Sequence, residues 1–150
     1  MQVKPILTAG FAGGLLLLVI MLLSGALANV VLPYTIFDIP GMRPADDPVS
    51  ILFFLYPFVI AFAAAILFDF LNPALHGGVG RRGLIFGMLL FIIVTIPNQF
   101  VIYASMYYPP GFYLSSVITG LIGYPIFGML CARIWRTYGI KELKSEARGI

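Results

Sequence analysis

Proline, asparagine and glutamine stand together at Pro97-Asn98-Gln99, inside a long apolar stretch. Proline has no backbone N–H, so a helix that runs through it leaves one carbonyl without its usual donor. Amide side chains in apolar surroundings are costly unless they are hydrogen-bonded. Such groups could line a cavity for a ligand or a permeating solute, with Asn29 and Tyr103 as further lining candidates. The alternative, which we favour, is that Asn98 and Gln99 link helices and satisfy the carbonyl that Pro97 frees.

Asp69 is the one acidic residue inside an apolar stretch, and an intramembrane carboxylate is by default a functional candidate. Its position near the end of that stretch favours another interpretation. Arg81 and Arg82 follow after a short turn, and Arg133 lies near the end of a later stretch. We therefore predict an interfacial charge cluster of Asp69, Arg81, Arg82 and Arg133, in which the aspartate is ion-paired.

Catalytic and metal-binding chemistry find little support in the sequence. A single cysteine, Cys131, and a single histidine, His76, cannot supply a Cys/His ligand set, so no metal site is predicted. No serine or cysteine nucleophile has a histidine at membrane depth, and no paired carboxylates flank a cavity. We expect a protein that is not an enzyme, although an enzyme acting on a lipid or quinone is a third possibility. The sequence specifies no cofactor.

The elements that must position these residues follow from composition. Of the 150 residues, 61% are hydrophobic and 10% are charged, whereas about 25% are charged in globular domains. A membrane-spanning helix needs about 20 apolar residues. Four stretches meet this length, at residues 5–31, 50–71, 83–107 and 112–135, and residues 136–150 form a tail. The predicted fold is all-α, a four-transmembrane-helix bundle in a single integral membrane domain that covers residues 1–150.

The basic residues predict the orientation of this bundle, because lysine and arginine near span ends are retained in the cytoplasm. Only Arg43 falls on the side of the long first loop. The other eight fall on the side of both termini: Lys4, Arg81, Arg82, Arg133, Arg136, Lys141, Lys144 and Arg148. We predict a multi-pass protein of the cell (inner) membrane with both termini and the tail in the cytoplasm. The net charge of +3 then reflects topology, and no nucleic-acid partner is expected.

Small residues recur at a spacing that lets helices approach closely. Gly10 and Gly14 in the first stretch match Gly83 and Gly87 in the third, and Tyr56-Pro57 in the second matches Tyr124-Pro125 in the fourth. The chain could therefore consist of two repeated helical hairpins in the same orientation. Alternatively, glycine and proline are simply frequent in membrane helices. We expect the two glycine pairs to pack helices within the chain rather than between subunits.

One segment carries a family resemblance. The run from Arg82 to Phe91, continued through Thr95-Ile96-Pro97 to Tyr103 and Met106, resembles a recurring pattern in small, uncharacterised four-helix membrane proteins of prokaryotes. That family has no established activity. The resemblance therefore implies an architecture and no function.

Two functions are compatible with these features. The leading one is an accessory or structural subunit that packs against other membrane proteins, because the loops are small and no self-sufficient active site is present. The alternative is a homo-oligomeric channel or carrier for a small solute, lined by the Pro97-Asn98-Gln99 region. The expected partners are the lipid bilayer and either another membrane protein or further copies of this chain.

Overall fold

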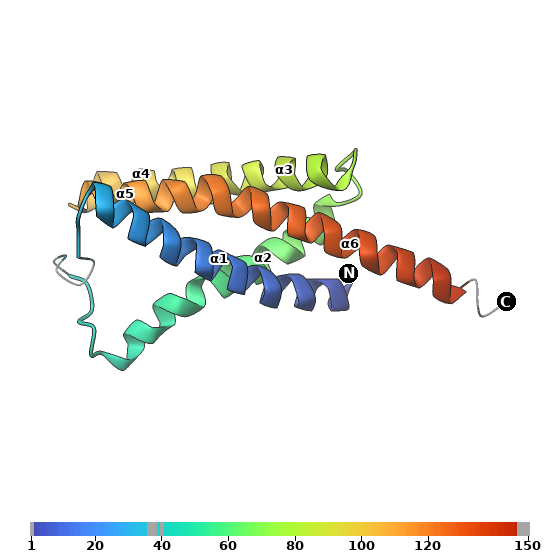
Figure 1. The fold of residues 1–150 in the computed structure, drawn as a ribbon, viewed down its shortest axis with the longest axis horizontal. Helices are drawn as coiled ribbons and strands as arrows, with labels where there is room; N and C mark the ends of the chain where they lie inside the picture. Colours follow the sequence, from blue (N-terminus) through green and yellow to red (C-terminus); the bar gives the residue numbers. More distant parts are fainter. Residues whose placement is uncertain (1, 36–38, 40, 147–150) are drawn as a thin grey trace.

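The chain folds into a bundle of long helices in the computed structural model, which describes residues 2–35, 39 and 41–146 and the side chains among them up to residue 140 (Figure 1). The first crossing is α1 (Val3–Val31). The second consists of η2 (Pro48–Leu55) and α2 (Tyr56–Leu71), the third of α3 (Val79–Leu90), η3 (Phe91–Thr95) and α4 (Ile96–Ser105), and the fourth of α5 (Pro110–Ile118), η4 (Thr119–Gly123) and α6 (Tyr124–Glu146).

All four crossings are long and apolar enough to span a membrane, over Val3–Val31, Pro48–Leu71, Val79–Ser105 and Pro110–Ile140. This confirms the predicted all-helical architecture with four apolar helices and makes the chain a multi-pass membrane protein. The third crossing begins four residues before the predicted start, because the chain is already helical from Val79. The fourth begins at Pro110, where a missing N–H costs nothing. Residues 147–150 of the predicted tail, with Arg148, lie outside the described residues.

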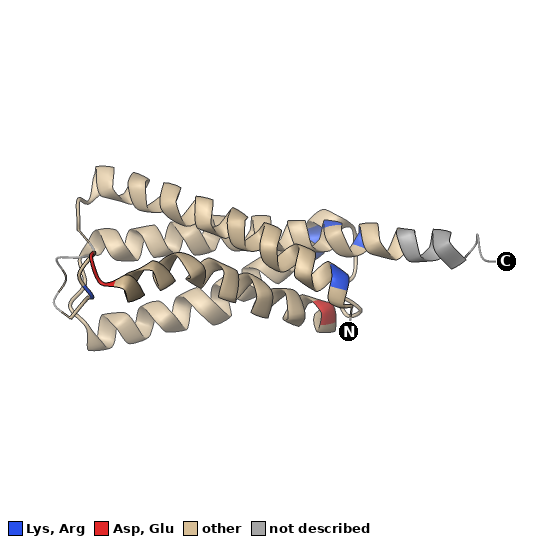
Figure 2. Ribbon diagram, turned by 90° about the horizontal axis from the view of Figure 1, so that it is seen from below, with Lys and Arg blue, Asp and Glu red and all other residues tan. Residues whose placement is uncertain are grey.

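Charged side chains lie at the two ends of the bundle, and the described middle of the molecule carries none (Figure 2). We call the end that holds both termini and the turn at residues 72–78 the termini end. The opposite end, with residues 32–47, is the loop end (Figure 1). At the loop end Arg43 pairs with Asp47, with 2.7 Å between Nη1 and Oδ2. This separation of charge is what a bilayer between the two ends requires.

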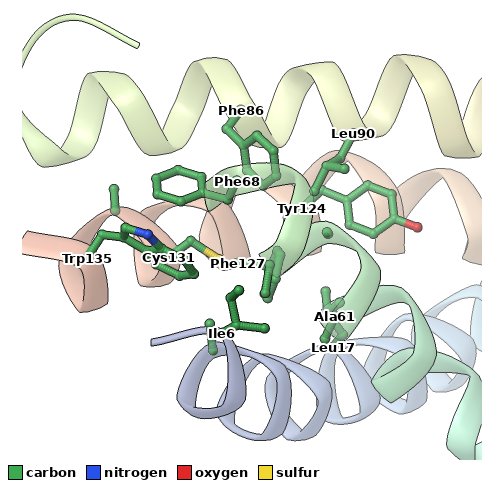
Figure 3. Close-up of a cluster of buried hydrophobic side chains, with 14 residues drawn as sticks. Ile6, Leu17, Ala61, Phe68, Phe86, Leu90, Tyr124, Phe127, Cys131 and Trp135 are labelled. Atoms are coloured by element: carbon green, nitrogen blue, oxygen red, sulfur yellow. The ribbon is translucent and has the colours of Figure 1, made fainter. Parts of the chain in front are cut away.

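Aromatic side chains fill the half of the bundle nearer the termini end (Figure 3). Phe68 of α2, Phe86 of α3 and Phe127 of α6 have no exposed surface. The ring centroids of Phe68 and Phe86 are 4.9 Å apart, and those of Phe68 and Trp135 are 5.1 Å apart, both edge to face. Such aromatic pairs add about 0.5–1.5 kcal/mol beyond the area that they bury. Cys131 is also fully buried here.

Glycines bring the helices of this half into close contact. A Cβ on Gly10 or Gly14 of α1 would overlap the ring of Phe62 or Phe58 of α2, respectively. These glycines therefore form the grooves into which α2 inserts its rings. Because glycine has no side chain, the two helices can approach closely and gain van der Waals contact. In lipid this packing replaces the hydrophobic drive for association.

The contact between α3 and α6 is closer still, because backbone meets backbone. A Cβ on Gly83 would overlap the main chain of Met129, and one on Gly87 would overlap the main chain of Pro125. Gly128 of α6 lies in turn against the carbonyl of Gly83. In both hairpins the glycine pair of the first helix thus faces the part of the second helix at or just after a Tyr-Pro pair. The predicted repeat itself stays a prediction.

The seams between the crossings differ. Over the described residues, α1 packs along α2, α5 and α6, and α3 packs along α6. No comparable contact joins η2 or α2 to α3 or α4 in this part of the chain. Near the termini end, the ring pair of Phe68 and Phe86 bridges this seam between the second and third crossings. Towards the loop end η2 diverges from the other helices (Figure 1), and among the described elements its one extensive contact is with α2.

Candidate functional site

A cavity of about 800 Å³ occupies the loop-end half of the bundle. This volume lies within the range of about 300–1,000 Å³ that is typical of small-molecule sites. Residues of every crossing line it: Met21, Leu22, Gly25, Ala26, Asn29, Tyr34, Thr35, Phe53, Tyr56, Val94, Thr95, Asn98, Gln99, Phe112, Ser115, Ser116, Thr119, Gly120 and Tyr124. Hydroxyl and amide groups are numerous among them, and none is charged.

The helices change their winding around this cavity. The η3 and η4 segments are π-helical and η2 is a 3₁₀-helix, and each ends two residues before a proline: Pro57, Pro97 and Pro125. Proline cannot donate to the carbonyl four residues earlier and clashes with it in a regular α-helix. A local change of hydrogen-bond spacing relieves that clash, and π-bulges are frequent at functional sites. Irregular backbone at membrane depth is tolerated where it lines a cavity.

The two π-helical segments lie against each other at the base of the cavity. A Cβ on Gly120 of η4 would overlap the Thr95 hydroxyl and crowd the Phe91 ring of η3. Tyr124 connects this base to the aromatic core, because its ring is buried in the core cluster and its hydroxyl points away from the other core side chains (Figure 3). Tyr124 lines the cavity together with its neighbour Thr95.

The sequence-predicted amides are at the cavity wall. Asn98 is exposed and Gln99 is partly buried, and both line the cavity. Gln99 Oε1 is itself buried and has no hydrogen-bond partner among the described residues. An unpaired acceptor in such a place costs about 1–3 kcal/mol, which a donor from a ligand would recover. Pro97 does not line the cavity; it sets the winding of the helix that carries the two amides.

Asn29 also lines the cavity, but its amide is already used. Its Nδ2 donates to the Tyr34 carbonyl at 3.1 Å, and its Oδ1 accepts from the Tyr34 N–H at 3.3 Å. Asn29 thus closes the turn that follows α1. Tyr103 does not line the cavity, contrary to the expectation: its side chain is 78% exposed and its ring packs on Tyr113, with centroids 6.1 Å apart.

The predicted charge cluster at the termini end is arranged differently from the expectation. Asp69 accepts from Trp135 Nε1 at 2.9 Å and from the backbone N–H of Gln2 at 3.1 Å. Arg82 donates to Asn72 Oδ1. Over the described residues no ion pair joins Asp69 to an arginine. The carboxylate thus has an indole and a main-chain N–H as partners, and Arg81 and Arg133 are exposed.

Two cavity residues that the sequence did not indicate as site residues are Tyr56 and Tyr124. Both precede a proline, and this Tyr-Pro pairing was visible as a possible repeat. The signal was present, but nothing in the sequence shows that the two rings face the same space. In the described residues, no three His, Cys, Asp or Glu side chains lie close enough together to hold a metal ion.

The chain significantly matches no protein-family model, no curated protein and no solved structure. The resemblance to small prokaryotic four-helix membrane proteins therefore stays a prediction. The cavity is the feature of this chain that bears on its function.

Proposed function

We propose that this chain binds a small uncharged molecule in the loop-end cavity and acts as a carrier for it. The observation that supports this proposal is the cavity itself, about 800 Å³ with many hydroxyl and amide groups and no charged side chain among its lining residues. Burying an ion without a compensating charge is far more costly than burying a neutral polar group. A neutral ligand therefore suits this lining better than a phosphate or an ammonium group.

A carrier fits the arrangement better than an open channel does. The cavity lies at the loop end, whereas Phe68, Phe86 and Phe127 are fully buried and fill the half nearer the termini. A permanently open pore would need a polar path past those rings. A carrier needs a site that is open to one side at a time, and the loop-end cavity, with its hydroxyl and amide groups, suits such a site.

The proposal includes an orientation in a prokaryotic cell membrane, with the cavity towards the outside and both termini in the cytoplasm. The distribution of basic residues, eight on one side and Arg43 on the other, supports it. Cysteine labelling tests it, in a Cys131→Ala background that removes the one native thiol. An impermeant maleimide should label Asp46→Cys in intact cells and His76→Cys only after permeabilisation. The reverse pattern would invert the assigned topology.

Glycerol flux into vesicles tests the carrier proposal, because glycerol is neutral and small. Purified protein in liposomes should accelerate glycerol entry, followed by light scattering, above the rate of protein-free vesicles. Asn98→Leu and Gln99→Leu should lower that rate, because they remove hydrogen-bonding groups from the cavity wall. Phe100→Leu is the matched control on the same helix, since Phe100 is 71% exposed and does not line the cavity. Equal flux in all variants would remove the amides from the pathway.

The second candidate is the accessory subunit that packs against other membrane proteins. It is favoured by η2 and α4, in which no residue is buried, so the chain itself does not cover these two segments. The glycine pairs do not add to this case, because helices of the same chain occupy them. Purification in mild detergent distinguishes the two functions. A discrete homo-oligomer or monomer without a co-purifying protein would contradict the accessory role.

A further inference from the structure

The open seam between the second and third crossings leads from the cavity to the surroundings of the bundle. Phe53 and Tyr56 line the cavity from one side of this seam, and Asn98 and Gln99 line it from the other. In the described chain, contacts of η2 or α2 with α3 or α4 are sparse compared with those between α1 and α2 or between α3 and α6. Both walls belong to crossings apolar enough to span a membrane. The opening therefore lies at membrane depth and faces lipid.

The walls of the seam suit contact with hydrocarbon. Phe53 is 45% exposed and Tyr56 47%, and no residue of η2 or α4 is buried. Apolar side chains next to the opening would contact an acyl or prenyl chain as it passes from the bilayer into the cavity. The apolar part of the lining, including Met21, Leu22 and Val94, continues this surface inwards.

The polar groups inside indicate the head group that would fit. A phosphate would need arginine, lysine or several convergent N–H donors. The described lining carries no charged residue. It does carry a buried acceptor that has no donor among the described residues, Gln99 Oε1. A hydroxyl supplies the missing donor and keeps the ligand neutral.

We infer that the cavity takes a neutral lipid with a hydroxyl head group, which enters sideways from the bilayer through the seam between η2 and α4. The hydroxyl lies at the Gln99 amide, and the hydrocarbon chain extends out past Phe53 into the membrane. This inference rests on the proposed binding function and specifies its substrate class. A diacylglycerol and a long-chain alcohol both qualify, because each has a neutral hydroxyl head group and a hydrocarbon chain.

Photolabelling in nanodiscs tests the inference. The probe is a diacylglycerol with a diazirine in one acyl chain, mixed into phosphatidylcholine, and the labelled peptides are mapped by mass spectrometry. Labels should concentrate on Phe53–Tyr56 and Val94–Gln99. Unlabelled diacylglycerol should compete, and its 3-O-methyl ether should compete about fivefold less well, the factor that one hydrogen bond of about 1 kcal/mol gives.

Two variants on α1 control for non-specific labelling. Gly25→Leu fills the cavity without a backbone clash, because a Cβ there meets only Ser115 Oγ at 3.8 Å, and it should abolish the seam labels. Ala12→Leu adds the same bulk to an exposed position of the same helix outside the cavity and should leave them unchanged. Ser116→Leu serves as a second cavity-filling variant if Gly25→Leu does not fold.

The outcomes separate this inference from the proposed function. Labels spread over the exposed apolar surface without competition overturn it, and equal competition by the ether overturns the role of the hydroxyl. If glycerol flux depends on Asn98 and Gln99 while no lipid labels the seam, the carrier function stands and the lipid assignment fails. If both measurements are negative, both proposals fail.

Discussion

The two halves of this bundle have similarly apolar sequences but differ in how closely their helices pack. In the half nearer the termini, helices touch through glycine, and fully buried rings such as Phe127 fill the space between them. In the loop-end half, the helices change winding, two segments bury no residue at all, and a cavity of about 800 Å³ remains. We therefore expect the half nearer the termini to supply most of the stability and the loop-end half to hold the proposed binding site.

This difference arises from local sequence. Where glycines face large rings, close helix contact fills the space. Around the cavity, where prolines, hydroxyls and amides concentrate, η3 and η4 stay in contact but the second and third crossings separate. Membrane helices depend on packing and hydrogen bonds for association, because lipid solvates apolar side chains as well as a protein interior does. The loop-end half gives up part of that packing, so we expect substitutions there to change ligand binding far more than folding.

The largest change in the free energy of unfolding is expected for Phe127→Ala. Truncating a fully buried phenylalanine removes contacts and leaves a cavity, which costs about 3–5 kcal/mol. Unfolding by increasing mole fraction of dodecyl sulfate, followed by circular dichroism, measures the loss. Phe100→Ala is the matched control, because this ring is 71% exposed and should change the free energy of unfolding little. Similar losses in both variants would contradict the division into a packed and a hollow half.

A matched glycine pair gives the next largest effect. Gly87→Leu forces a side chain into the main chain of Pro125 and should destabilise the protein by about 1–3 kcal/mol or more. Gly25→Leu enters open cavity space and should leave the unfolding transition nearly unchanged. The same denaturation experiment reads out both. Equal destabilisation would mean that the loop-end half is packed after all.

A smaller effect is expected at the termini end for Trp135→Phe. It removes the hydrogen bond from the indole to the Asp69 carboxylate and should cost about 1.5 kcal/mol, the low end for a bond to a charged group. Arg81→Gln should cost less, because Arg81 is exposed and does not pair with Asp69 in the described structure. A larger loss for Arg81→Gln would restore the ion pair that the sequence suggested.

The smallest effect is expected for Arg43→Gln, next to the start of η2 at the loop end. The Val49 N–H and then the Arg43 guanidinium hold the pKa of Asp47 below its ordinary value. A depressed pKa stabilises the folded form above the ordinary value of about 3.9, and this contribution is lost as the pH falls through the folded pKa. Arg43→Gln should therefore raise the pKa of Asp47 in a carbon-13 NMR titration in micelles. An unchanged titration would show that the ion pair does not anchor η2.

The sequence predicted the four helices well, because unbroken apolar stretches of span length leave few alternatives in a membrane. It also placed Asn98 and Gln99 at a candidate site. It did not show that Tyr103 lies away from the cavity, with its ring on Tyr113 of α5. That contact joins two crossings, so neither stretch encodes it alone.

The partners of Asp69 were missed for another reason. Charge counting suggested arginines, whereas the carboxylate is bound by an indole and a main-chain N–H that are distant in sequence. Only the packing of α1, α2 and α6 brings those groups together. The hollow volume is likewise a property of several helices at once, and no single stretch encodes it.

Thiol accessibility tests the central contrast most directly. Native Cys131 is fully buried in the packed half, and Ser116→Cys in a Cys131→Ala background places a thiol on the cavity wall. In nanodiscs, N-ethylmaleimide should modify the thiol at position 116 quickly and Cys131 only after denaturation. Protection of both thiols would contradict a hollow loop-end half, and rapid modification of Cys131 would contradict a packed one.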